Sequence, residues 1–193
     1  MSLTRILACA LTFIISDMCN AQETNNAEKS DTTERSKLFE ISFGQSVLFI
    51  SNSKVVDIRN ENAAVVPTNS ILFLAELRPE KKLRIPIFFN LATETKQFLV
   101  NGQLTNEKTS PTFGAGIQFR PFAWNIDKKS RLEFEFGPLA SFLITSKKTI
   151  LVAPVLAGRI RLWKGESVSM YVGTSYSFGI DCWGLLYGTG TIF

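Results

Sequence analysis

The sequence predicts an all-β protein, namely an eight-stranded antiparallel up-and-down β-barrel that spans a membrane. Three observations carry this prediction: an export signal at the start of the chain, eight later segments of β character, and alternation of large apolar with small or charged residues within them. A membrane-spanning helix needs about 20 apolar residues, and the chain has no run of that length. If this chain crosses a membrane, it must therefore do so with strands.

Residues 1–21 are expected to be a cleaved signal peptide. A short basic start precedes the apolar stretch Ile6–Ile15, which is too short to span a bilayer, and a polar region follows it. Cys19 and Ala21 are the small residues at the −3 and −1 positions of the expected cleavage site. Residues 22–37 are polar, charged and free of aromatic residues, so we expect a disordered leader ahead of a barrel domain over residues 38–193.

The eight segments have the length of a tilted transmembrane strand, about 9–11 residues, and polar or turn-forming residues separate them. They are Leu38–Ile50, Thr68–Arg78, Leu83–Ala92, Thr112–Phe122, Arg131–Ile144, Ile150–Leu162, Ser167–Phe178 and Trp183–Phe193. Membrane barrels have short periplasmic turns and longer extracellular loops. With a periplasmic N-terminus, the outer loops would be 51–67, 93–111, 145–149 and 179–182, and the inner turns 79–82, 123–130 and 163–166.

Alternation divides each segment into a large apolar face and a face of small or charged residues. In the seventh segment, for example, Val168, Met170 and Val172 oppose Ser169 and Gly173. A membrane barrel turns the apolar face to lipid, whereas a soluble barrel turns it inward, and alternation alone leaves both open. Small residues on the polar face favour a narrow interior. Aromatic residues at the ends of the apolar faces suit membrane interfaces: Phe39, Phe49, Phe113, Phe142, Phe178, Trp183 and Phe193.

The same parity places nine charged residues on the non-lipid face, near the strand ends expected to be periplasmic. They are Glu40, Glu76, Arg78, Arg84, Arg120, Glu133, Glu135, Arg159 and Arg161. Neighbouring strands bring such side chains within reach, and arginine suits bidentate contact with carboxylates. We expect ion pairs that close a narrow lumen, and a rearrangeable network with a weak ion path is the alternative. Acid–base chemistry is disfavoured, because the arginines would keep the glutamates ionised.

Composition excludes several function classes. The chain has no histidine, which removes Ser-His and Cys-His catalysis and the histidine metal and haem motifs. Only Cys182 remains after cleavage, so no disulfide framework is expected. The net charge is +4, without a basic patch interleaved with aromatic residues, so nucleic acid is not indicated. We expect no catalytic residue, cofactor or metal site.

The C-terminus carries a resemblance. Phe193 follows the alternating apolar residues Trp183, Leu185 and Tyr187, which resembles the signature that outer-membrane proteins present to the barrel-assembly machinery. Threonines stand at two positions where that signature has larger apolar residues. The region 38–193 resembles the small eight-stranded outer-membrane barrels of the OmpA-domain or OmpX class.

This resemblance implies the outer membrane of a Gram-negative bacterium, with the lipid bilayer and the assembly machinery as partners. The Asn20–Gln22 junction is similar to signal ends common in Bacteroidota. Lipid A enzymes of this barrel class use an active-site histidine, which this chain lacks. We therefore expect a non-enzymatic barrel with a structural or surface-interaction role through loops 51–67 and 93–111, whose partner the sequence does not identify. A narrow ion or small-solute channel and a soluble periplasmic barrel that binds an apolar ligand are the alternatives.

Overall fold

The computed structural model describes residues 38–144, 150–165 and 167–193. The predicted signal peptide, the predicted leader and the loop 145–149 lie outside the described residues, so those three remain predictions. Within the described ranges the regular structure consists of strands. No helix there is both long and apolar enough to cross a membrane.

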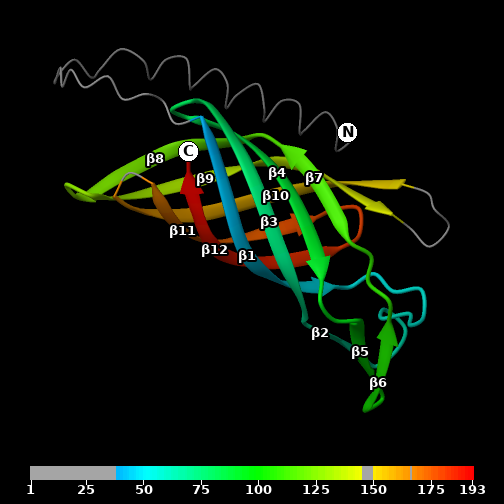
Figure 1. The fold of residues 1–193 in the computed structure, drawn as a ribbon. Helices are drawn as coiled ribbons and strands as arrows, with labels where there is room; N and C mark the ends of the chain where they lie inside the picture. The colour runs from blue at the N-terminus through cyan, green and yellow to red at the C-terminus, as the bar shows by residue number, and fades with distance from the viewer. Residues whose placement is uncertain (1–37, 145–149, 166) are drawn as a thin grey trace, which may run out of the picture. The chain divides into compact units, whose positions relative to one another are not determined.

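The strands form a closed antiparallel barrel with eight strand positions (Figure 1). In order around the barrel these are β1 (Phe39–Ile50), β3 (Thr68–Glu80), β4 (Leu83–Ala92), β7 (Thr112–Gly116) with β8 (Gln118–Asp127), β9 (Ser130–Ile144), β10 (Ile150–Lys164), β11 (Val168–Ser177) and β12 (Cys182–Ile192). The strands β7 and β8 share one position, because both pair with β4 and β9. The barrel closes where β1 pairs with β12 without a register shift, from Glu40↔Ile192 to Ile50↔Cys182. This confirms the predicted fold class.

The barrel has two unlike ends. At the end where β1 begins and β12 finishes, called the terminal end below, short turns join the hairpins β3–β4, β8–β9 and β10–β11. The opposite end, called the loop end, carries the long connections 51–67 and 93–111. Figure 1 shows a separate small sheet at the loop end, formed by β2 (Ala63–Val66), β5 (Lys96–Val100) and β6 (Gln103–Glu107).

This small sheet is absent from the sequence-based prediction, which treated both connections as loops. Its β5–β6 hairpin turns at Asn101 and Gly102, which have φ values of 48° and 79°. Two consecutive residues of positive φ match the tight turn that joins antiparallel strands, and Asn-Gly is its usual sequence. The Asn101-Gly102 dipeptide could therefore have predicted this hairpin from the sequence.

All three predicted turns at the terminal end were too long, and that at 79–82 is shorter by two residues because β3 continues to Glu80. Residues 123–127, predicted as part of a turn, extend β8, so that the turn itself is at 128–129. Trp124 pairs with Leu132 and stacks on Phe122 with ring centroids 5.6 Å apart, and such cross-strand apolar contacts favour continued pairing over a turn. The predicted 163–166 turn begins too early for the same kind of reason, since β10 continues through Trp163 to Lys164 and remains paired with β9.

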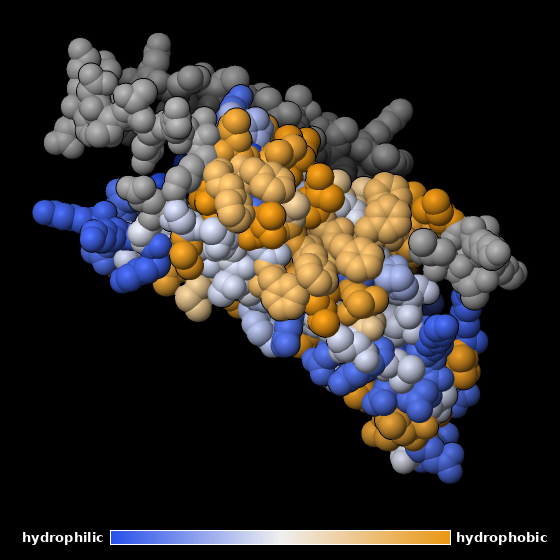
Figure 2. Space-filling view, viewed as in Figure 1, coloured by the Kyte–Doolittle hydropathy of each residue, from blue (hydrophilic) through white to orange (hydrophobic). Residues whose placement is uncertain are grey.

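The outward face of the barrel is apolar. Figure 2 shows hydrophobic residues gathered over the middle of the face formed by β1, β3, β4 and β7, with hydrophilic residues toward both ends. A row of five phenylalanines in consecutive register crosses this region: Phe43, Phe73, Phe89, Phe113 and Phe142. The first four expose 40% to 53% of their surface. Exposed aromatic and aliphatic side chains outside, with charges inside, are the pattern of a transmembrane barrel.

Candidate functional site: a charge plug below a lumen cavity

Seven of the nine charged residues singled out by parity meet inside the barrel, toward the terminal end. Each exposes between 0% and 4% of its surface, and we call these seven the charge plug: Glu40, Glu76, Arg84, Glu133, Glu135, Arg159 and Arg161. Their Cα partners explain the encounter, because Glu133 lies opposite Arg161, Glu135 opposite Arg159 and Glu40 opposite Glu76. Alternation turns all of them inward, and barrel closure brings the two groups together across the lumen.

Glu76 and Arg159 form the centre of the charge plug. Both nitrogens of the Arg159 fork lie 2.6 Å from the two oxygens of Glu76, and its Nε donates to Glu135 at 2.6 Å. Arg161 donates to both oxygens of Glu76 at 2.7 and 2.9 Å. One carboxylate thus accepts hydrogen bonds from two guanidinium groups, which is the bidentate geometry that holds arginine and carboxylate most firmly.

Glu40 extends the charge plug to the seam between β1 and β12. It accepts hydrogen bonds from the other arm of Arg161, from Ser169 at 2.8 Å and from Ser42 at 3.2 Å. Each serine lies on an inward position of its strand and is almost completely buried. Small hydroxyl residues on the polar face therefore complete the hydrogen bonding of a buried carboxylate that arginine alone would leave partly unsatisfied.

Glu133 collects the donors at the terminal end of the charge plug. Arg120 lies 2.5 Å and Arg131 2.9 Å from its Oε1, while the Trp163 indole nitrogen donates to its Oε2 at 2.8 Å. Arg84 is farther away at 3.7 Å, and donates to three turn carbonyls, those of residues 80, 81 and 83. The sequence analysis missed Arg131 and Trp163. Arg131 shares the parity of Glu133 and could have been found, whereas Trp163 had been placed in a turn.

Arg78 and Arg120, the other two predicted residues, are only partly buried at the edge of the charge plug. Arg78 lies 4.8 Å from the centroid of the Trp163 ring, and Arg161 lies 5.4 Å from it. Among the described residues no carboxylate is within ion-pair distance of Arg78. Its cation–π contact with Trp163 is its closest charge-compensating interaction, and such contacts with desolvated rings are stabilising.

The charges of the charge plug are paired with one another. Each of its carboxylates is held by arginine, and the chain has no histidine to move a proton near neutral pH. Among the described residues no group of three or more metal-ligating side chains is present. These mutually paired charges fill the narrow lumen.

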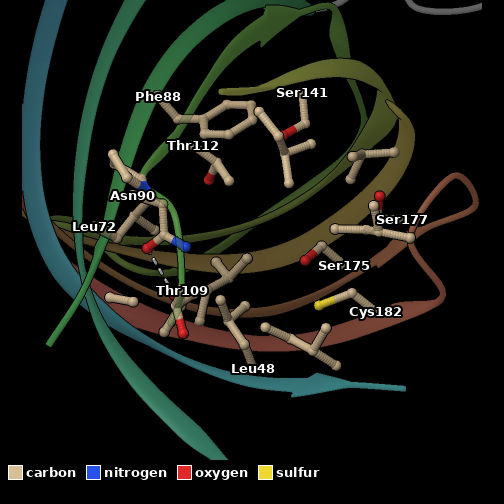
Figure 3. A pocket seen from close by; sticks show the side chains of 18 of the residues that line it. Leu48, Leu72, Phe88, Asn90, Thr109, Thr112, Ser141, Ser175, Ser177 and Cys182 are labelled. Atoms are coloured by element: carbon tan, nitrogen blue, oxygen red, sulfur yellow. Dashed lines mark hydrogen bonds between the residues drawn. The ribbon is translucent and has the colours of Figure 1, made fainter. Parts of the chain in front are cut away.

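A cavity of about 730 Å³ occupies the lumen between the charge plug and the loop end. Its walls combine aliphatic residues such as Leu48 and Leu72 and the ring of Phe88 with serine, threonine and asparagine side chains, and Arg159 and Gln118 lie at its floor. Figure 3 shows side chains from opposite sides of the barrel, Phe88 on one side and Ser177 on the other, directed into this common space. The volume falls in the range of about 300–1,000 Å³ that is typical of small-molecule sites. The cavity was not predicted from the sequence. Alternation identifies which residues face inward, but not how much space remains between opposite walls once the barrel closes.

No protein-family model matches the chain, and no curated protein matches it in sequence. Solved structures do resemble it. The outer membrane protein OprG from Pseudomonas aeruginosa is similar with a TM-score of 0.51 and 14% identity, over 80% of this chain and 95% of OprG. Neisserial surface protein A and the N-terminal β-barrel domain of Pseudomonas aeruginosa OprF each reach a TM-score of 0.46, at 11% and 8% identity, over 80% and 81% of this chain and 97% and 96% of theirs. At this identity the similarity to OprG concerns the fold alone, and nothing further follows from the two weaker matches.

Proposed function

We propose that this protein is a non-enzymatic barrel of the Gram-negative outer membrane, that it does not conduct ions, and that it acts through its loop end. The observation that carries the proposal is the charge plug. Four buried glutamates pair with arginines across the full width of a narrow lumen, and an ion could pass only if several of these contacts separated together. The apolar outward belt supports a lipid-facing position, which disfavours the soluble periplasmic barrel.

Orientation and assembly belong to the same proposal. Membrane barrels place short turns in the periplasm and long connections outside, which favours an extracellular loop end. Export would depend on cleavage of the predicted signal peptide, residues 1–21. Phe193 lies at the terminal end and is 68% exposed, and the barrel-assembly machinery would bind it there. Replacing Phe193 by alanine should then reduce the folded protein in outer-membrane fractions without changing its refolding in detergent.

The small sheet at the loop end is the best candidate for a surface interaction. Ala64, Leu99 and Leu104 occupy paired positions on one face of it and are exposed. On the other face Phe98 is completely buried. An ordered sheet with exposed apolar side chains offers a partner a firmer surface than a solvated loop does.

Two measurements test the proposal. Purified protein in planar bilayers should give no stepwise current at neutral pH, and persistent ion-selective currents abolished by Arg159→Ala would instead establish the channel alternative. Protease added to intact cells should cut within residues 96–107. Cleavage of that segment only after the outer membrane is permeabilised would overturn the proposed orientation.

A further inference from the structure

The lumen cavity goes beyond the proposed function, because neither a closed barrel nor a surface role requires it. The surface of its walls is mainly apolar, and several buried polar side chains also line it, two of which have an unpaired oxygen. Gln118 and Ser177 expose 3% and 7% of their surface, and their side-chain oxygens Oε1 and Oγ have no hydrogen-bond partner among the described residues. Buried polar atoms are nearly always paired, so we expect these two oxygens to bond water that shares the cavity with any apolar ligand.

The charge at the cavity differs between its floor and its mouth. At the floor, Arg159 is fully engaged by Glu76 and Glu135 and offers no free charge. At the mouth, Lys96 pairs with Glu107 at 3.2 Å and donates to the Asn52 carbonyl at 2.7 Å. Lys54 and Lys108 also line the cavity, and both are exposed without an ion pair among the described residues. The mouth is therefore net positive above an apolar interior.

We propose that the cavity binds one single-chain anionic amphiphile, of the long-chain fatty acid class, with its chain in the lumen and its carboxylate at Lys54 and Lys108. An apolar chain fits the aliphatic walls, and burying it there releases the water that otherwise contacts them. The closed floor makes this a binding site with one entrance rather than a route through the barrel. The lysines give the site its preference for an anionic headgroup over a neutral one.

The test uses full-length protein refolded in lipid nanodiscs and a palmitate analogue with a photoreactive diazirine near the end of its chain. After illumination, mass spectrometry should locate the label on cavity-lining residues such as Leu72 or Val155. Ala157→Trp, at a lining position 5% exposed, should abolish this labelling. The matched control is Leu156→Trp, the adjacent residue that is 50% exposed on the outward face, and it should leave the labelling unchanged. Label confined to outward residues in the wild type or in Leu156→Trp, or unchanged lumen labelling in Ala157→Trp, would overturn the proposal.

Two further readouts keep the test decisive if Ala157→Trp does not fold. Cys182 lines the cavity, so palmitate should slow its modification by a small methanethiosulfonate reagent, followed on the Cys182 peptide. Unchanged modification at saturating palmitate would count against an occupied lumen. Lys54→Gln and Lys108→Gln should each weaken palmitate about two- to fivefold, the contribution of an exposed charge pair, and should not weaken hexadecanol. Equal effects on both compounds would refute the assigned headgroup position.

Discussion

Replacing Glu76 by glutamine tests whether the charge plug stabilises the barrel. The substitution preserves the shape of the side chain and removes one negative charge from between two arginines. Arg159 would keep Glu135 at 2.6 Å, and Arg161 would keep Glu40 and a longer contact of 3.3 Å with Glu135. Breaking a buried ion pair costs about 3–5 kcal/mol. Because neither arginine loses every partner, we expect the lower end, about 3 kcal/mol, which is roughly a 100-fold change in the unfolding equilibrium.

The assay is urea unfolding in lipid vesicles, followed by tryptophan fluorescence. Glu80→Gln is the control, because Glu80 is exposed on the same strand, and its effect should stay within about 0.5 kcal/mol. Arg159→Gln, alone and with Glu76→Gln, completes a double-mutant cycle in which the coupling energy should exceed about 1 kcal/mol. The reasoning fails if Glu76→Gln destabilises no more than Glu80→Gln, or if the coupling energy is zero.

Three further predictions use the same unfolding assay. Gly188→Val should cost about 1–3 kcal/mol, since a β-carbon at Gly188 would lie 2.6 Å from the Tyr171 hydroxyl, and a wild-type stability would contradict this crowding. Leu156→Arg, near the middle of β10 and outward, should cost about 2–4 kcal/mol in a bilayer, and a neutral effect would argue that lipid does not cover this face. Trp163→Phe should cost about 1–3 kcal/mol, because it removes the indole hydrogen bond to the buried Glu133 carboxylate, and an unchanged midpoint would show that this bond contributes nothing.

The barrel strands were predictable because their signals are local. Alternation in the Val168–Ser177 and Cys182–Ile192 strands repeats with period two, and turn residues bound both of them. The turn predicted at 123–130 was too long for a physical reason. The segment 123–127 contains polar residues typical of turns, but it stays paired with β9, where Trp124 lies opposite Leu132, and that pairing is not visible in either segment alone.

The face on which each side chain lies was predictable from the same alternation. Its level along the barrel axis was predictable only in part. Parity put Glu133 and Arg161 on one face and at a similar level, and they are Cα partners in the structure. Parity put Glu76 and Arg159 on the inward face but did not indicate that they pair, because they are 83 residues apart and meet only across the closed barrel. The contact between Trp163 and Glu133 was not predicted, because Trp163 was assigned to a turn and not to the end of β10.

The sequence by itself determined how many strand positions the barrel has, where along the chain each strand lies and which side chains share a face, because these signals are local to a few residues. Tertiary structure alone decided which glutamate meets which arginine and how much space remains above them. Both depend on closure of β1 against β12, which sets the distances across the lumen. A pattern along one strand cannot specify a distance to the opposite wall, and that is why the charge plug could be anticipated and the cavity could not.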